Sequence, residues 1–143
     1  MKSYNRNKIK QLNHPYINPN NEIKISENTD VHESINFITD LFLKHNYNTI
    51  YISGLNKAIK KVVLITEIIK SKIPGLHQIT NINSLENKKD EEIDDNKIIP
   101  RLSITLTFIE PSEEEKKDLG YQKPISISLI SELSKIHNLN NNY

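Results

Sequence analysis

The chain has 143 residues, no cysteine and a formal net charge of +1, which suits one domain with tails. No stretch reaches the roughly 18 consecutive apolar residues of a membrane-spanning helix, and the first 20 residues lack the apolar run of a signal peptide. We therefore expect a soluble, intracellular protein. The absence of cysteine excludes disulfides, thiol catalysis and cysteine-ligated zinc.

The small net charge hides an asymmetry along the chain. Residues 1–80 contain 11 Lys/Arg and 6 Asp/Glu, whereas residues 81–143 contain 8 and 12. This distribution indicates a basic surface for a polyanion, offset by acidic loops. A compositional bias toward Lys, Asn and Ile would produce the same basic segments without any ligand.

The first elements are an arm, a strand and a helix. Residues 1–21 are rich in Asn, Lys and Tyr, show no apolar period and are predicted to form a flexible basic arm. Residues 22–26 alternate isoleucine with charged side chains, which predicts a short strand with one wet face. Asp30 followed three residues later by Glu33 predicts the start of a helix that ends near His45.

A second strand and a second helix follow. Residues 48–53 alternate in the same way and predict a strand that stops at Gly54. A helix is predicted from about Lys57 to Ile73, and its apolar positions occupy more than half of the circumference. Such a helix needs cover on two sides. The sheet can supply one side, and either a partner subunit or the first helix can supply the other.

The last predicted strands flank a charged segment. Pro74 and Gly75 end the second helix, and residues 76–82 predict a third strand. Residues 84–100 are too charged for a core and predict a long exposed loop. Residues 102–108 alternate most regularly, with apolar side chains on one face, and predict a strand on a two-layer core.

This order predicts the fold class. We expect an α+β domain over residues 22–110, with βαβαββ order and two helices packed on one face of a four-stranded mixed sheet. Residues 111–143 are predicted to form a C-terminal extension with a short helix at about 128–137.

Catalytic and metal-binding patterns do not emerge from the sequence. The five histidines have no metal-ligand spacing, and no phosphate-binding or dinucleotide-binding glycine motif is present. The carboxylates of residues 86–95 and 113–115 are expected to be solvated, and neither Ser53 nor Ser103 lies in a nucleophile elbow. We therefore expect no enzyme, metal, cofactor or small-molecule substrate.

The junction after the second strand carries the strongest functional signal. A turn there leads into a helix whose first turns contain Lys57, Lys60 and Lys61. Cations at a helix N-terminus oppose its dipole and cost about a few tenths of a kcal/mol each, unless an anion offsets them. The phosphates of a nucleic acid would supply that anion. The alternative is that these lysines are ordinary solvated surface residues with no ligand. Further contacts to unpaired bases are expected from Tyr51, His77 and Gln78.

Several segments together resemble a known family. Residues 54–61 (Gly-Leu-Asn-Lys-Ala-Ile-Lys-Lys) resemble the glycine-basic-Ala-Ile turn of the Alba superfamily. Residues 73–80, with Leu-His-Gln, residues 103–107 and the Gly-Tyr-Gln-Lys-Pro of residues 120–124 are similar to the long eukaryotic Alba proteins. They are also similar to the related larger Alba-type subunit of nuclear RNase P and RNase MRP. The resemblance covers about residues 22–125.

The resemblance implies a function and a set of contacts. It implies a dimer, with itself or with another Alba-type protein, that binds RNA and/or DNA without catalysis in the nucleus and/or the cytoplasm. The family's basic turn falls on Lys57, with Lys61 one helical turn later, and its usual second glycine is Asn56 here. The complete expected nucleic-acid-binding set is Tyr51, Gly54, Asn56, Lys57, Lys60, Lys61 and Arg101, with Lys8 and Lys10 from the arm.

Two departures from the family pattern affect binding. The loop before the first helix and its first turn are basic in the family, whereas Asp30 and Glu33 make them acidic here. The hairpin between the last two strands is also largely acidic. These features predict weaker binding, tuning to RNA, or sharing with a more basic partner. The alternative function is a heterodimerising structural subunit of an RNase P/MRP-like ribonucleoprotein with weak intrinsic affinity.

Overall fold

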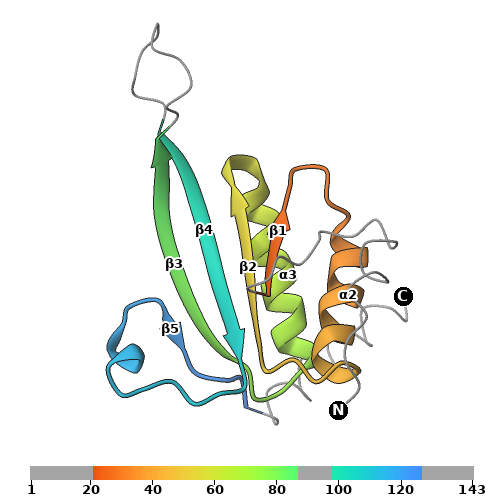
Figure 1. Cartoon of the computed structure of the whole chain (residues 1–143), viewed down its shortest axis with the longest axis vertical. Coiled ribbons are helices and arrows are strands. Elements are labelled where there is room, and N and C mark those ends of the chain that lie inside the picture. Colours follow the sequence, from red (N-terminus) through yellow and green to blue (C-terminus); the bar gives the residue numbers. More distant parts are fainter. Residues whose placement is uncertain (1–20, 87–97, 127–143) are drawn as a thin grey trace, which may run out of the picture.

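The computed structural model describes residues 21–86 and 98–126, and these form two layers (Figure 1). Two helices pack on one face of a mixed five-stranded sheet with the order β1-β2-β4-β3-β5. β1 is parallel to β2, and every other neighbouring pair is antiparallel. The elements are β1 (Glu22–Ile25), α2 (Val31–Leu43), β2 (Thr49–Leu55), the 3-10 turn η1 (Asn56–Ala58), α3 (Ile59–Lys72), β3 (His77–Glu86), β4 (Ile98–Thr107), η2 (Glu115–Lys117) and β5 (Tyr121–Gln122).

The α+β class and the βαβαββ order predicted from the sequence are confirmed, but the sheet is larger than predicted. A fifth strand, β5, pairs with the edge of β3 and comes from beyond residue 110, where the predicted domain ends. β5 has only two residues, so no alternation could reveal it. The predicted helix at 128–137 lies outside the described residues.

The strands around the projecting hairpin also run further than predicted. β2 continues through Gly54 to Leu55, and the predicted loop of 84–100 contains the last part of β3 and the first part of β4. The register pairs Glu86 with Ile98 at the far end of this hairpin (Figure 1). In this part of the hairpin the two strands satisfy each other's backbone hydrogen bonds, and neither face of the hairpin has to be buried. The low apolar content of residues 84–100 therefore did not indicate that the strands continue there.

Apolar alternation on the strands builds the core. Ile50 and Ile52 are fully buried, while Tyr51 between them is 42% exposed on the face away from the helices. Phe108, expected on the core face, lies just after β4, is 38% exposed and packs edge-on against Phe42 with ring centroids 5.4 Å apart. The other fully buried large apolar side chains of the described residues are Ile23, Ile38, Leu41, Val62, Ile65, Ile69, Leu76 and Leu106.

Both helices begin close to their predicted positions. The Asp30 side chain accepts a hydrogen bond from the Glu33 amide at 2.9 Å and caps α2, as the Asp30/Glu33 spacing predicts. The chain enters α3 through η1. The side of α3 that faces the sheet is buried, but Val63 and Leu64 on α3 remain 44% and 49% exposed. The wide apolar surface predicted for this helix is therefore only partly covered within one chain.

A polar cluster fastens β5 to β3 and α3. The buried Lys70 ammonium donates hydrogen bonds to Gln78 Oε1 at 2.6 Å and to Gln122 Oε1 at 3.0 Å. His77 Nδ1 lies 2.8 Å from the Tyr121 hydroxyl, and the two rings stack. The Leu-His-Gln and Gly-Tyr-Gln motifs therefore contact each other directly. We call these five residues the Lys70 cluster.

Candidate functional site

The turn between β2 and α3 has a backbone that the sequence anticipates. Asn56 adopts the left-handed conformation, with φ of 51°, which asparagine tolerates better than most residues. A Cβ on Gly54 would lie 2.7 Å from Val62 Cγ2, so glycine is required there by the close approach of α3. These two residues fix the direction in which the chain enters α3.

The three predicted lysines differ in their surroundings. Lys57 lies 3.9 Å from Glu27 Oε1, and both side chains are well exposed, so this ion pair is weak. Lys60 is exposed and forms no ion pair in the part of the chain that the structure describes. Lys61 Nζ instead donates to the carbonyl oxygens of Glu27 and Thr29, at 2.5 and 2.7 Å. It fastens the β1–α2 loop, a role that the sequence did not indicate.

Arg101 is brought to the same end of the sheet but is already paired. Its Nη2 lies 2.7 Å from Glu22 Oε1, and the Ser53 hydroxyl donates to the same oxygen at 2.8 Å. Arg101 is opposite Leu55 in the β2–β4 register, one strand away from the lysine turn. Its charge is therefore largely balanced where it stands.

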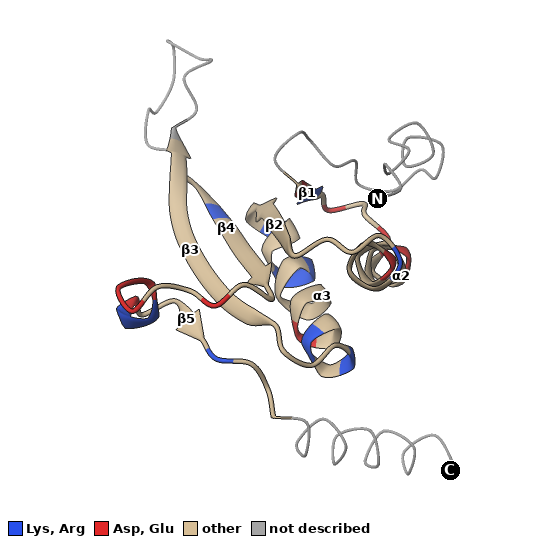
Figure 2. Cartoon of the chain, turned by 60° about the horizontal axis from the view of Figure 1, so that its bottom comes forward, with Lys and Arg blue, Asp and Glu red and all other residues tan. Residues whose placement is uncertain are grey.

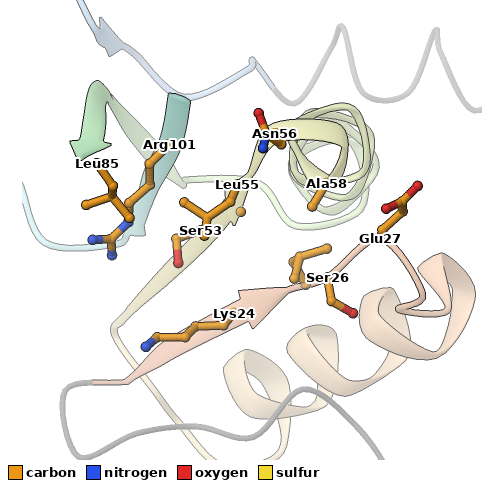
Figure 3. Close-up of a pocket in the computed structure, with 11 residues that line it drawn as sticks. Lys24, Ser26, Glu27, Ser53, Leu55, Asn56, Ala58, Leu85 and Arg101 are labelled. Carbon is orange, nitrogen blue, oxygen red and sulfur yellow. The ribbon is translucent and has the colours of Figure 1, made fainter. Parts of the chain in front are cut away.

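An open hollow lies beside the turn, which we call the turn pocket. It has a volume of about 410 Å³. Figure 3 shows Leu85, Arg101 and Leu55 along one side, Lys24 of β1 and Ser26 just after β1 on the other, and Ser53 between them. Its full lining is Lys24, Ile25, Ser26, Glu27, Ser53, Gly54, Leu55, Asn56, Ala58, Leu85 and Arg101.

Lys24 is the cation that sequence reasoning missed at this site. It is exposed, lines the turn pocket and has no carboxylate partner among residues 21–86 and 98–126. The alternation in β1 placed Lys24 on the wet face. What local spacing could not show is that β1 runs parallel to β2, with Lys24 opposite Ser53. Figure 2 shows further basic residues along α3 and on β4.

The predicted base contacts from His77 and Gln78 are wrong. Both side chains are buried, at 8% and 4% exposure, and belong to the Lys70 cluster. They start β3 at the end opposite the hairpin, where β5 covers the strand edge. Tyr51 is exposed as predicted, on the helix-free face of the sheet. Lys8 and Lys10 lie outside the described residues.

The start of α2 is acidic, where the Alba family carries lysine or arginine. Asp30 and Glu33 occupy the helix start, and the Asp30 carboxylate is engaged in capping.

Within the described residues, no group of three or more His, Cys, Asp or Glu side chains is arranged to hold a metal ion. No described helix is both long and apolar enough to cross a membrane.

Known proteins match this domain. Residues 21–86 match the Alba family model. The DNA/RNA-binding protein ALBA2 of Plasmodium falciparum (isolate 3D7) is 37% identical over 67 residues, covering 47% of this chain and 31% of that protein. The DNA/RNA-binding protein ALBA1 of the same organism is 25% identical over 118 residues, covering 79% of this chain and 48% of that protein. The chain thus spans less than half the length of either relative.

Two solved structures were also aligned with this chain. Alba from Thermoplasma volcanium aligns with a TM-score of 0.43 and 19% identity, over 59% of this chain and 98% of that one. ALBA1 from Trypanosoma brucei aligns with a TM-score of 0.43 and 13% identity, over 87% and 96%. The match of residues 21–86 to the family model and the similarity to the two Plasmodium proteins support an Alba superfamily protein.

Proposed function

We propose that this chain is a non-enzymatic protein that binds RNA and/or DNA through phosphate contacts, as a dimer. The observation that carries the proposal is the pair of exposed lysines, Lys57 and Lys60, at the entry to α3. Within residues 21–86 and 98–126 these two side chains have only one ion pair, the long one from Lys57 to Glu27, although both charges oppose the helix dipole. Support also comes from the names of the two Plasmodium relatives, which are DNA/RNA-binding proteins.

The contacts at the turn suit phosphate. Lys57 has only a long, exposed ion pair to give up, and Lys60 has none within the described residues. Binding of phosphates by these side chains would release counterions and would be largely independent of base sequence. Lys61 acts indirectly in this proposal, because its two carbonyl contacts fix the β1–α2 loop beside the turn. Lys8 and Lys10 remain proposed contributors from the arm.

Exposed apolar side chains support the dimer. Val63 and Leu64 on α3 are 44% and 49% exposed, and Ile82 on β3 is 72% exposed. Ile82 pairs with the buried Leu102, so it belongs to the helix-covered side of the sheet but extends beyond the helices. Burial of such side chains contributes about 25 cal/mol per Å² of apolar surface. A second copy or another Alba-type protein would provide that cover.

Removal of these two exposed lysines tests the proposal. The variant is Lys57→Ala/Lys60→Ala, and the matched control is Lys117→Ala/Lys123→Ala, which removes the same charge from exposed positions near β5. Fluorescence anisotropy with a single-stranded RNA between 50 and 300 mM salt should show a salt slope about 1.4 smaller for the test variant, from ~0.7 per lost phosphate contact. A test variant with the parent's affinity and slope would refute the assignment.

A second function is favoured by the local carboxylates. Asp30 and Glu33 make the start of α2 acidic, and Glu22 balances Arg101. These features suit a heterodimerising structural subunit of an RNase P/MRP-like ribonucleoprotein, with weak intrinsic affinity. Sedimentation and RNA binding of this protein alone, and mixed with a second Alba-type protein, separate the two functions. Binding by the mixture alone supports the structural subunit.

A further inference from the structure

We propose that the turn pocket receives a single unstacked base of a single-stranded nucleic acid, while the neighbouring phosphates remain at its rim. This inference rests on the proposed function and deepens it. It assigns a base-binding role to residues of β1, β2 and the β3–β4 hairpin, most of which carry no charge. It also predicts a preference for single strands that phosphate contacts alone would not produce.

The size of the pocket is that of a small-ligand site. Its volume of about 410 Å³ lies at the lower end of the roughly 300–1,000 Å³ typical of small-ligand sites. A base inside a duplex would have to be extruded to enter, at a cost of about a few kcal/mol, whereas an unpaired base avoids most of that cost. The pocket therefore favours a single strand.

The charges inside the pocket favour a neutral ring over a phosphate. Arg101 is paired with Glu22 at 2.7 Å, and Glu27, which lines the pocket, would repel an anion that entered it. Lys24 lies on the β1 side of the opening and has no carboxylate partner among the described residues (Figure 3). Lys57 follows the lining residue Asn56 along the chain. A phosphate bound by either lysine would stay outside while its base points inward.

The walls combine apolar area with a few polar groups. Leu55 and Leu85 are 41% and 40% exposed although they line the same hollow, so each has apolar surface available for the face of a base. The Ser53 hydroxyl donates a hydrogen bond to Glu22. The Ser53 Oγ can therefore still accept a hydrogen bond from a base. The Asn56 carboxamide adds a donor and an acceptor at the rim.

The test changes the apolar walls without changing charge. The variant is Leu55→Gln/Leu85→Gln, and its matched control is Leu43→Gln/Leu119→Gln, at two exposed leucines that do not line the pocket. All four substitutions are at exposed positions, and circular dichroism verifies the fold. Each protein is titrated against a single-stranded RNA and a duplex DNA of equal length, at one salt concentration. The RNA carries one 2-aminopurine, whose fluorescence rises when the base leaves its stack.

The expected result is selective. The test variant should bind the single strand about tenfold more weakly, equivalent to ~1.4 kcal/mol, with little change for the duplex and a smaller 2-aminopurine signal. The control should match the parent. Equal losses on both probes, or unchanged single-strand binding with an unchanged signal, would overturn the pocket assignment and leave the phosphate-binding function intact. A parent protein that binds neither probe would instead remove the proposed function itself.

Discussion

Replacement of Lys70 by methionine tests how β5 is held on the sheet. Lys70 is 4% exposed and donates to Gln78 Oε1 at 2.6 Å and to Gln122 Oε1 at 3.0 Å. Methionine is similar in length but supplies no donor. Gln122 is exposed and can hydrate, whereas the buried Gln78 oxygen loses its charged partner.

The expected loss in the free energy of unfolding follows from the unpaired Gln78 oxygen. A buried acceptor left without a partner costs about 1–3 kcal/mol, and removal of the buried ammonium offsets part of this. We expect Lys70→Met to lower the free energy of unfolding by about 1–2 kcal/mol. In a domain of this size each kcal/mol corresponds to a fall in Tm of roughly 4–8 °C. Thermal and urea unfolding followed by circular dichroism measure both quantities.

Two further variants make the result decisive. Lys72→Met makes the same chemical change at an exposed position in the last turn of α3 and should cost far less. Lys70→Met combined with Gln78→Leu removes donor and acceptor together, and should cost less than the sum of the single changes. The reasoning fails if Lys70→Met is as stable as Lys72→Met, or if the two changes in the double variant are additive.

Two other changes act at the turn. Gly54→Ala places a Cβ 2.7 Å from Val62 Cγ2 and should destabilise the fold by about 1–3 kcal/mol, measured by urea unfolding; unchanged stability would show that α3 can shift freely. Glu22→Gln keeps an acceptor for Ser53 but removes the charge that balances Arg101. Single-stranded RNA should then bind more tightly, with a salt slope steeper by ~0.7, and an unchanged slope would show that Arg101 does not reach phosphate.

Local patterns predicted the elements well because the governing interactions are local. Alternation placed Ile50 and Ile52 on the core side and Tyr51 outside, and the Asp30/Glu33 spacing located the start of α2. The partners of individual polar groups depend on contacts between distant segments. Lys61 and the carbonyls it binds are more than 30 residues apart, so a helix pattern cannot reveal that role.

The same limit explains the error at β3. His77 and Gln78 start β3, which would be an edge strand without β5, and exposed polar side chains are ordinary on such an edge. β5 pairs with this part of β3 and buries both side chains, although His77 and its partner Tyr121 are 44 residues apart in the sequence. The co-occurrence of the Leu-His-Gln and Gly-Tyr-Gln motifs was the available signal. It carried the resemblance to the Alba superfamily, and in the structure the two motifs are in contact.

The cations near the turn divide into two groups with different consequences for binding. Lys61 and Arg101 are committed to partners within the chain, whereas among the described residues Lys24 and Lys60 have no carboxylate partner and Lys57 has only a weak one. Three lysines engaged on phosphate would give a single-strand salt slope near −2, and a dimer that presents both sets would give about −4. Among the described residues the electrostatic contribution of one subunit is therefore modest. A neutral base site would add affinity without more charge, whereas a second subunit would add affinity by presenting its own set of lysines.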